Sequence, residues 1–180
     1  MTSVIVLYVK PMNPVLGVLL PVGPVSVPTL PSGRTFVLPL GAARTPVQFP
    51  SDELVAVEVD TAETDPLALF GYGIELQAHP PGPDQPALVP VVTGGITIDA
   101  PADPTPTEGG TIKGNVMTGQ STGPLDVELW AHDGRVAAIR VQRTPPQTGF
   151  QFAALEPATY VVLAAGFVPE KVIVPARKIL

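Results

Sequence analysis

Hydrophobic and polar residues alternate along several short stretches of this chain, and none of these stretches has the length or period of a helix. Residues 54–59 (LVAVEV) and 73–78 (GIELQA) alternate with the period of two that is typical of a half-buried β-strand. Shorter apolar runs follow at 87–92 and 96–98, and proline and glycine residues punctuate them as turns. The pattern therefore predicts an all-β protein with no helix of consequence.

Residues 1–50 have a different pattern, in which proline repeatedly interrupts the apolar runs. Proline removes a backbone donor, so a proline inside such a run argues against a central strand. It favours an edge strand or an extended segment that lies on another surface. We therefore predict that this region includes an extended, proline-rich arm. The interrupting residues are Pro21, Pro24, Pro28 and Pro39.

The stretch 101–108 (PADPTPTE) marks the best domain boundary in the chain. Prolines that alternate with small polar residues form a stiff, extended linker. We predict a β-rich assembly or docking region at 1–100, a linker at 101–108 and a separate domain at 109–180. Because few contacts should cross the linker, we expect the last region to fold independently.

The region after residue 109 contains short alternating runs about ten residues apart, a spacing typical of a β-sandwich. Residues 125–131 and 137–142 alternate most regularly. The dipeptide Asp133-Gly134 lies between them and is a strong signal for a two-residue β-hairpin. Further runs lie at 150–152, 160–164 and 171–174.

Four motifs in this region, taken in order, resemble the carboxypeptidase regulatory-like domain, also called the transthyretin-like or prealbumin-like module. The family's opening Gly-x-Ile-x-Gly-x-Val strand is matched by 110–116, and its Pro-x-x-Val-x-Leu strand by 124–129. Residues 149–155 carry the glycine, two aromatics and leucine of its third motif. Its closing Pro-Gly-x-Tyr-x-Val is matched by 157–162, with Ala158 where glycine is usual.

This resemblance implies a small immunoglobulin-like, prealbumin-like β-sandwich at the end of the chain. Most members of the family are non-catalytic appendages that provide rigidity, adhesion or decoration, and such modules also occur on bacteriophage virion proteins. The resemblance covers only the C-terminal region and specifies a fold better than a function.

Charge is distributed unevenly, and this excludes some partners. Residues 1–50 hold three basic residues and no acid, whereas residues 51–112 hold eleven acids and no Lys or Arg. An acidic middle argues against a nucleic-acid surface. A segment as apolar and weakly charged as the first fifty residues is either deeply buried or faces a partner.

Candidate chemistry is sparse. The chain has no cysteine, so it has neither disulfides nor thiolate metal sites. His79 and His132 are far apart in sequence and are interpreted as solvated turn residues. Asp60, Glu63 and Asp65 lack the ligand spacing of a calcium loop, so a solvated loop is favoured. No nucleophile motif or phosphate loop is present, and the sequence predicts no enzyme, no cofactor and no metal.

Four residues are the candidates for partner contact. Trp130 falls on the polar phase of its strand, where it would anchor a partner, a carbohydrate or the neighbouring domain. The alternative is that a twisted or bulged strand turns it into the core. Lys10, Arg34 and Arg44 are the basic residues of the N-terminal region, and we expect them to face an acidic neighbour such as 51–112 of an adjacent copy.

Together these features predict a structural protein of a bacteriophage virion, either a capsid decoration protein or a tail or neck component. It would dock through its N-terminal region onto other virion proteins or copies of itself, without nucleic acid or membrane. The N-terminus lacks the basic start and cleavage site of a signal peptide, so we expect synthesis in the host cytoplasm and residence in the virion. The alternative is an accessory carbohydrate-binding or spacer module of a larger surface or hydrolase system.

Overall fold

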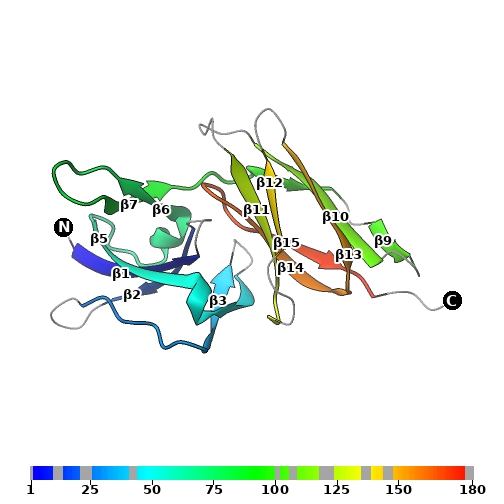
Figure 1. Cartoon of the computed structure of the whole chain (residues 1–180), viewed down its shortest axis with the longest axis horizontal. Coiled ribbons are helices and arrows are strands. Elements are labelled where there is room, and N and C mark those ends of the chain that lie inside the picture. Colours follow the sequence, from blue (N-terminus) through cyan, green and yellow to red (C-terminus); the bar gives the residue numbers. More distant parts are fainter. Residues whose placement is uncertain are drawn as a thin grey trace.

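The structure is a computed structural model of the whole chain. It describes residues 2–9, 14–20, 26–40, 44–99, 102–105, 109–117, 124–134, 139–143 and 148–176. This part of the chain is all-β, which confirms the predicted fold class (Figure 1). Its helical segments are two short 3-10 turns, η1 (Ser51–Glu53) and η2 (Ala68–Gly71). The strands are β1 (Thr2–Val9), β2 (Val15–Leu19), β3 (Thr35–Leu40), β4 (Thr45–Pro50), β5 (Leu54–Thr61), β6 (Tyr72–Gln77), β7 (Gln85–Pro90), β8 (Ile96–Ile98), β9 (Ala102–Thr105), β10 (Gly109–Val116), β11 (Leu125–Ala131), β12 (Ile139–Arg143), β13 (Gly149–Leu155), β14 (Ala158–Ala164) and β15 (Glu170–Val174).

The N-terminal module, which we define as β1–β7, is an incomplete barrel. Its main sheet has the order β2-β1-β5, with antiparallel pairing throughout. The β6–β7 hairpin continues the wall, because β7 lies beside β5 and a bridge joins Pro14, just before β2, to Gly73 of β6. The enclosed core consists of Val4, Val6, Tyr8, Val15, Val59, Leu69 and Ile74.

The first strand is the most buried of this module. Residues 4–9 of β1 are all buried, because one face points into the barrel and Leu7 and Val9 pack on the other side. Pro39 and Pro46 face each other across the two-stranded β3–β4 hairpin, where both strands are edges, as predicted for Pro39. Pro28 lies in a segment without a strand, and Pro21 and Pro24 lie outside the described residues. Burial of this region against another polypeptide stays a prediction.

The C-terminal module, which we define as β8–β15, has two sheets. One has the order β13-β10-β8 with β9 also paired to β10, and the other has the order β12-β11-β14-β15. Alternating side chains of both sheets fill the space between them, as in a β-sandwich. The central members of this core are Ile112, Val127, Leu129, Phe150, Phe152, Tyr160, Val162 and Val172.

The C-terminal module begins earlier than the predicted boundary at residue 109. β8 pairs with β10, and Ile96 is buried in the core of the sandwich. β9 lies within the predicted linker and also pairs with β10. The proline-rich composition correctly indicated an extended backbone. An extended segment that lies beside an unpaired strand edge can pair with it, and β9 pairs with β10 in this way.

Two glycines of the opening motif allow the strands to approach closely. A Cβ placed on Gly114 would lie 2.2 Å from the carbonyl oxygen of Thr97 and 2.6 Å from the Phe150 ring. A Cβ on Gly110 would lie 2.3 Å from a methyl carbon of Val174. Close packing of the neighbouring strands therefore explains why glycine occupies these two positions of the motif.

Gly114→Ala is expected to lower the free energy of unfolding by about 1–3 kcal/mol, because the added methyl group must displace the backbone of β8. Gly71→Ala is the matched control, since nothing lies within 4 Å of its Cβ position. Chemical denaturation of both variants measures the difference. Equal stability of the two variants would mean that β8 does not pair with β10 as described.

Candidate functional site

The two modules pack against each other through the outer face of the β12-β11-β14-β15 sheet. Trp130 of β11, with Val161 and Leu163 of β14, joins a cluster with Leu7, Val9, Leu38, Val47 and Phe49 of the N-terminal module. The Trp130 and Phe49 rings have centroids 4.7 Å apart and are tilted by 49°. The backbone N–H of Gln48 also donates to the carbonyl oxygen of His132 at 3.2 Å. The two central strands of this sheet, β11 and β14, are therefore covered on both faces.

Trp130 accordingly contacts the neighbouring domain, which was one of its predicted roles. It is 4% exposed, so little of the indole is accessible to a separate partner or a carbohydrate. The strand needs no bulge for this burial, because its polar phase faces the N-terminal module while Leu129 faces the sandwich core. The sequence signal was the unbroken apolar run at 160–164, which is typical of a strand buried on both faces.

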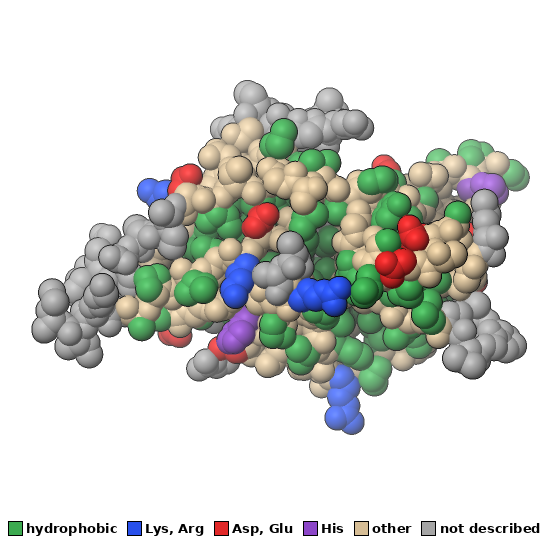
Figure 2. Space-filling view, turned by 180° about the vertical axis from the view of Figure 1, so that it is seen from behind, with side chains coloured by type: hydrophobic (Ala, Val, Ile, Leu, Met, Phe, Trp, Pro, Cys, Tyr) green, Lys and Arg blue, Asp and Glu red, His purple; other side chains and the backbone are tan. Residues whose placement is uncertain are grey.

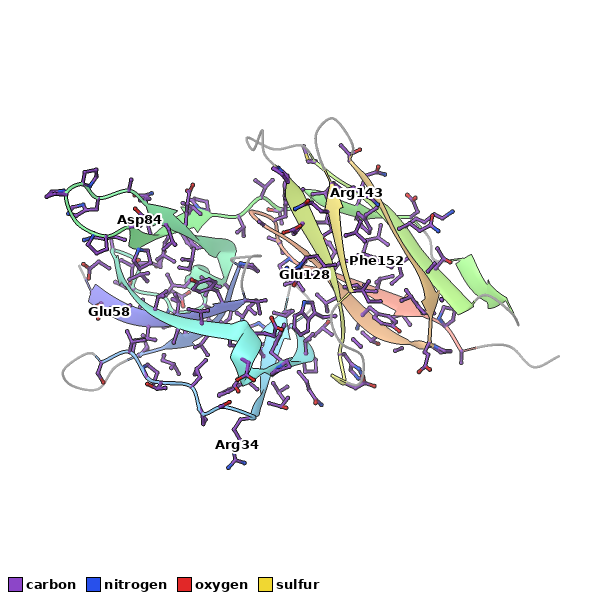
Figure 3. All side chains as sticks on the ribbon, viewed as in Figure 1. Arg34, Glu58, Asp84, Glu128, Arg143 and Phe152 are labelled. Atoms are coloured by element: carbon purple, nitrogen blue, oxygen red, sulfur yellow. The ribbon has the colours of Figure 1, made fainter. Side chains whose placement is uncertain are left out.

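A buried carboxylate lies beside Trp130. Glu128 is 1% exposed, and its carboxylate accepts hydrogen bonds from Trp130 Nε1 at 3.0 Å and from Arg140 Nε at 2.6 Å. The Arg140 guanidinium also forms an ion pair with it through Nη2. The hydrogen bond to Glu128 is the largest cause that raises the pKa of Arg140 above its usual value. Figure 3 shows Glu128 at the centre of the molecule, between the modules.

Sequence reasoning missed this carboxylate, because strict alternation on β11 suggested that Glu128 faces solvent. A buried charge with a paired guanidinium and an indole donor is electrostatically satisfied. Its geometry fixes the orientation of Trp130 at the contact between the modules. We interpret Glu128 as a structural group of this interface.

Arg140→Ala is expected to destabilise the protein more than the exposure of Arg140 suggests. The change leaves the Glu128 carboxylate buried without its counter-charge, at a cost of about 2–3 kcal/mol at pH 7. This is below the cost for a fully buried pair, because the Arg140 side chain is 49% exposed. Urea denaturation compares it with Arg34→Ala, an exposed control expected to change stability by under about 0.5 kcal/mol. A loss of stability in Arg140→Ala that is no larger than the loss in Arg34→Ala would contradict this role of Glu128.

The three basic candidates do not form one site. Lys10 lies outside the described residues. Arg34 is exposed immediately before β3, and its carbonyl oxygen accepts from Ser51 N–H at 2.8 Å. Arg44 is exposed immediately before β4, with a φ of 46°. Since Leu40 pairs with Thr45 and Thr35 with Pro50, the two arginines lie at opposite ends of the β3–β4 hairpin.

The histidines and acidic loops show no metal site. No group of three His, Asp or Glu side chains suited to a metal ion occurs among the described residues. His79 is exposed, whereas His132 is half-buried, with its backbone bonded to both modules rather than solvated. Glu63 accepts from the backbone N–H groups of Thr64 and Asp65, so this carboxylate stabilises its own turn. Within the described residues, no helix is long and apolar enough to cross a membrane.

A groove of about 850 Å³ opens on the N-terminal module between β5 and β7. Its walls are residues 58–63 and 85–88, with Tyr72 and Gln77 of β6. Three carboxylates and no Lys or Arg are among these residues. It lies away from the contact between the modules, at the end of the molecule where Glu58 and Asp84 are labelled (Figure 3). No sequence pattern indicated it, since it depends on how two distant strands diverge.

No family model, curated protein or solved structure matches this chain. The similarity to the carboxypeptidase regulatory-like domain therefore stays a prediction that rests on the four motifs.

Proposed function

We propose that the chain is a non-catalytic structural protein of a bacteriophage virion, a capsid decoration protein or a tail or neck component. It docks through its N-terminal module, onto copies of itself or other virion proteins, and displays the C-terminal β-sandwich. The virion setting is suggested by the motif resemblance. The docking role is supported by one observation on the surface.

That observation is the concentration of large exposed hydrophobic side chains between residues 19 and 37. Leu19, Leu20, Val27 and Val37 are 43–61% exposed, and they come from a stretch of the chain without acidic residues. Figure 2 shows hydrophobic side chains exposed among neutral and charged ones on one face of the molecule. Exposed apolar surface with little charge is typical of a protein–protein contact.

The packing between the modules supports the display of the sandwich. Because Trp130, Val161 and Leu163 are buried against the N-terminal module, the sandwich is held by side-chain contacts as well as by the chain connection. A docked N-terminal module would thus present the sandwich in a defined orientation. The alternative role in carbohydrate binding loses its main candidate residue, because the indole of Trp130 is buried.

The docking role is tested by the mass of the purified chain in solution. We expect a discrete oligomer by light scattering, and we expect Leu20→Asp/Val37→Asp to form a folded monomer, because a charge on each apolar contact prevents its desolvation. Leu76→Asp/Ile173→Asp is the matched control, with 59% and 54% exposed positions outside residues 19–37, and should keep the oligomer. Two results together would contradict the proposal: a wild-type chain that is monomeric in solution, and a gene that lies beside a hydrolase gene rather than among capsid and tail genes.

A further inference from the structure

In the N-terminal barrel, β5 and β7 lie beside each other without forming a ladder, and a groove opens between them at residues 58–63 and 85–88. Among the described strands, β5 pairs only with β1 and β7 only with β6, so each has one edge without a strand partner. These two edges border the groove of about 850 Å³. An unpaired edge carries backbone N–H and C=O groups that an additional strand can use.

β5 offers the better of the two edges. Successive residues of an antiparallel strand direct their backbone groups alternately toward the partner and away from it. Two of the four residues 58–61 therefore direct their backbone N–H and C=O groups into the groove. On the opposite wall Pro86 has no N–H to donate. Val59 and Thr61 are buried inside the barrel, whereas the side chains of the alternate residues are exposed.

The charge of the groove selects the kind of strand that fits. Glu58, Asp60 and Glu63 line it, and no basic residue is among the lining residues. Glu58 already accepts a hydrogen bond from Ser3 Oγ, and Glu63 bonds its own turn, but neither carboxylate faces a described Lys or Arg within the groove. Opposite charges across neighbouring strands stabilise pairing and like charges oppose it.

We propose that the groove between β5 and β7 binds an extended peptide segment bearing lysine or arginine, which adds as a strand to the free edge of β5. The segment would continue the β2-β1-β5 sheet toward β7 and narrow the opening of the barrel. This proposal rests on the docking role of the N-terminal module and names the chemistry of its partner. An acidic or proline-rich segment does not fit, because it would bring like charge or lack donors.

The first test uses a labelled peptide of alternating lysine and valine, KVKVKV, with the full chain in fluorescence anisotropy. Saturable binding is expected, and Glu58→Lys/Asp60→Lys should weaken it by about tenfold through lost attraction and new repulsion. Asp99→Lys/Glu156→Lys makes the same charge change at exposed positions of the sandwich. At physiological salt this control should change affinity by less than about twofold.

The second test separates strand pairing from simple charge attraction. A KVKVKV peptide that is N-methylated at every residue keeps its charge but loses all of its ladder donors, so it should bind at least about tenfold more weakly. Amide hydrogen exchange should slow within residues 58–61 only with the unmodified peptide. Absent binding, equal binding of both peptides, or unchanged exchange in β5 would each overturn the proposal. Since no assembly is involved, these outcomes are independent of the oligomer test.

Discussion

Trp130→Ala is expected to lower the free energy of unfolding by about 3–5 kcal/mol, the range found when a buried tryptophan is truncated. The indole is 4% exposed and packs on Phe49 of the other module. Its loss opens a cavity in a cluster that both modules share, and it removes the N–H that donates to the Glu128 carboxylate. Urea denaturation followed by circular dichroism measures the change.

The same substitution should also separate the unfolding of the two modules. With the shared cluster intact, we expect a single cooperative transition, whereas Trp130→Ala should unfold in two steps. Trp130→Phe is the control, because it keeps an aromatic ring against Phe49 and should retain one transition. A loss under about 1 kcal/mol for Trp130→Ala would place the indole outside the packed interface.

Phe152→Ala is expected to cost about 3–5 kcal/mol for a different reason. Phe152 is 2% exposed between the two sheets of the sandwich, with the Phe150 ring at a centroid distance of 5.6 Å. Gln151→Ala on the same strand is the control: its side chain is exposed on the opposite face, so a change within about 0.5 kcal/mol is expected. Comparable effects of the two substitutions in chemical denaturation would contradict the burial of Phe152 in the core and the exposure of Gln151 on the other face of β13.

The sandwich could be predicted because its strands obey simple rules. The alternation on β11 places Val127 and Leu129 in the core, and the chain turns at Asp133-Gly134, where Gly134 adopts a φ of 65°. The two-residue form of this hairpin stays a prediction, because residues 135–138 lie outside the described residues. Each of these signals is local, depending on neighbouring residues and backbone preference. They predicted the all-β class without any long-range information.

The features that were missed depend on contacts between distant segments. Trp130 and Glu128 look solvent-facing within β11 alone, and their burial requires the β3–β4 hairpin to cover the outer face of the sheet. Likewise, β8 looks like the last strand of the N-terminal region until it pairs with β10. The groove beside β5 arises where β7 diverges from it, and no sequence period encodes such a gap.

The packing of the two modules through Trp130 is most directly tested by the fluorescence of this residue, the single tryptophan of the chain. We predict short-wavelength emission and weak acrylamide quenching in the folded protein. Phe49→Ala, which changes only the N-terminal side of the contact, should shift emission to longer wavelength and increase quenching, while Gln151→Ala changes neither. A tryptophan that is quenched as readily in the folded as in the unfolded protein, or that is unaffected by Phe49→Ala, would contradict this packing.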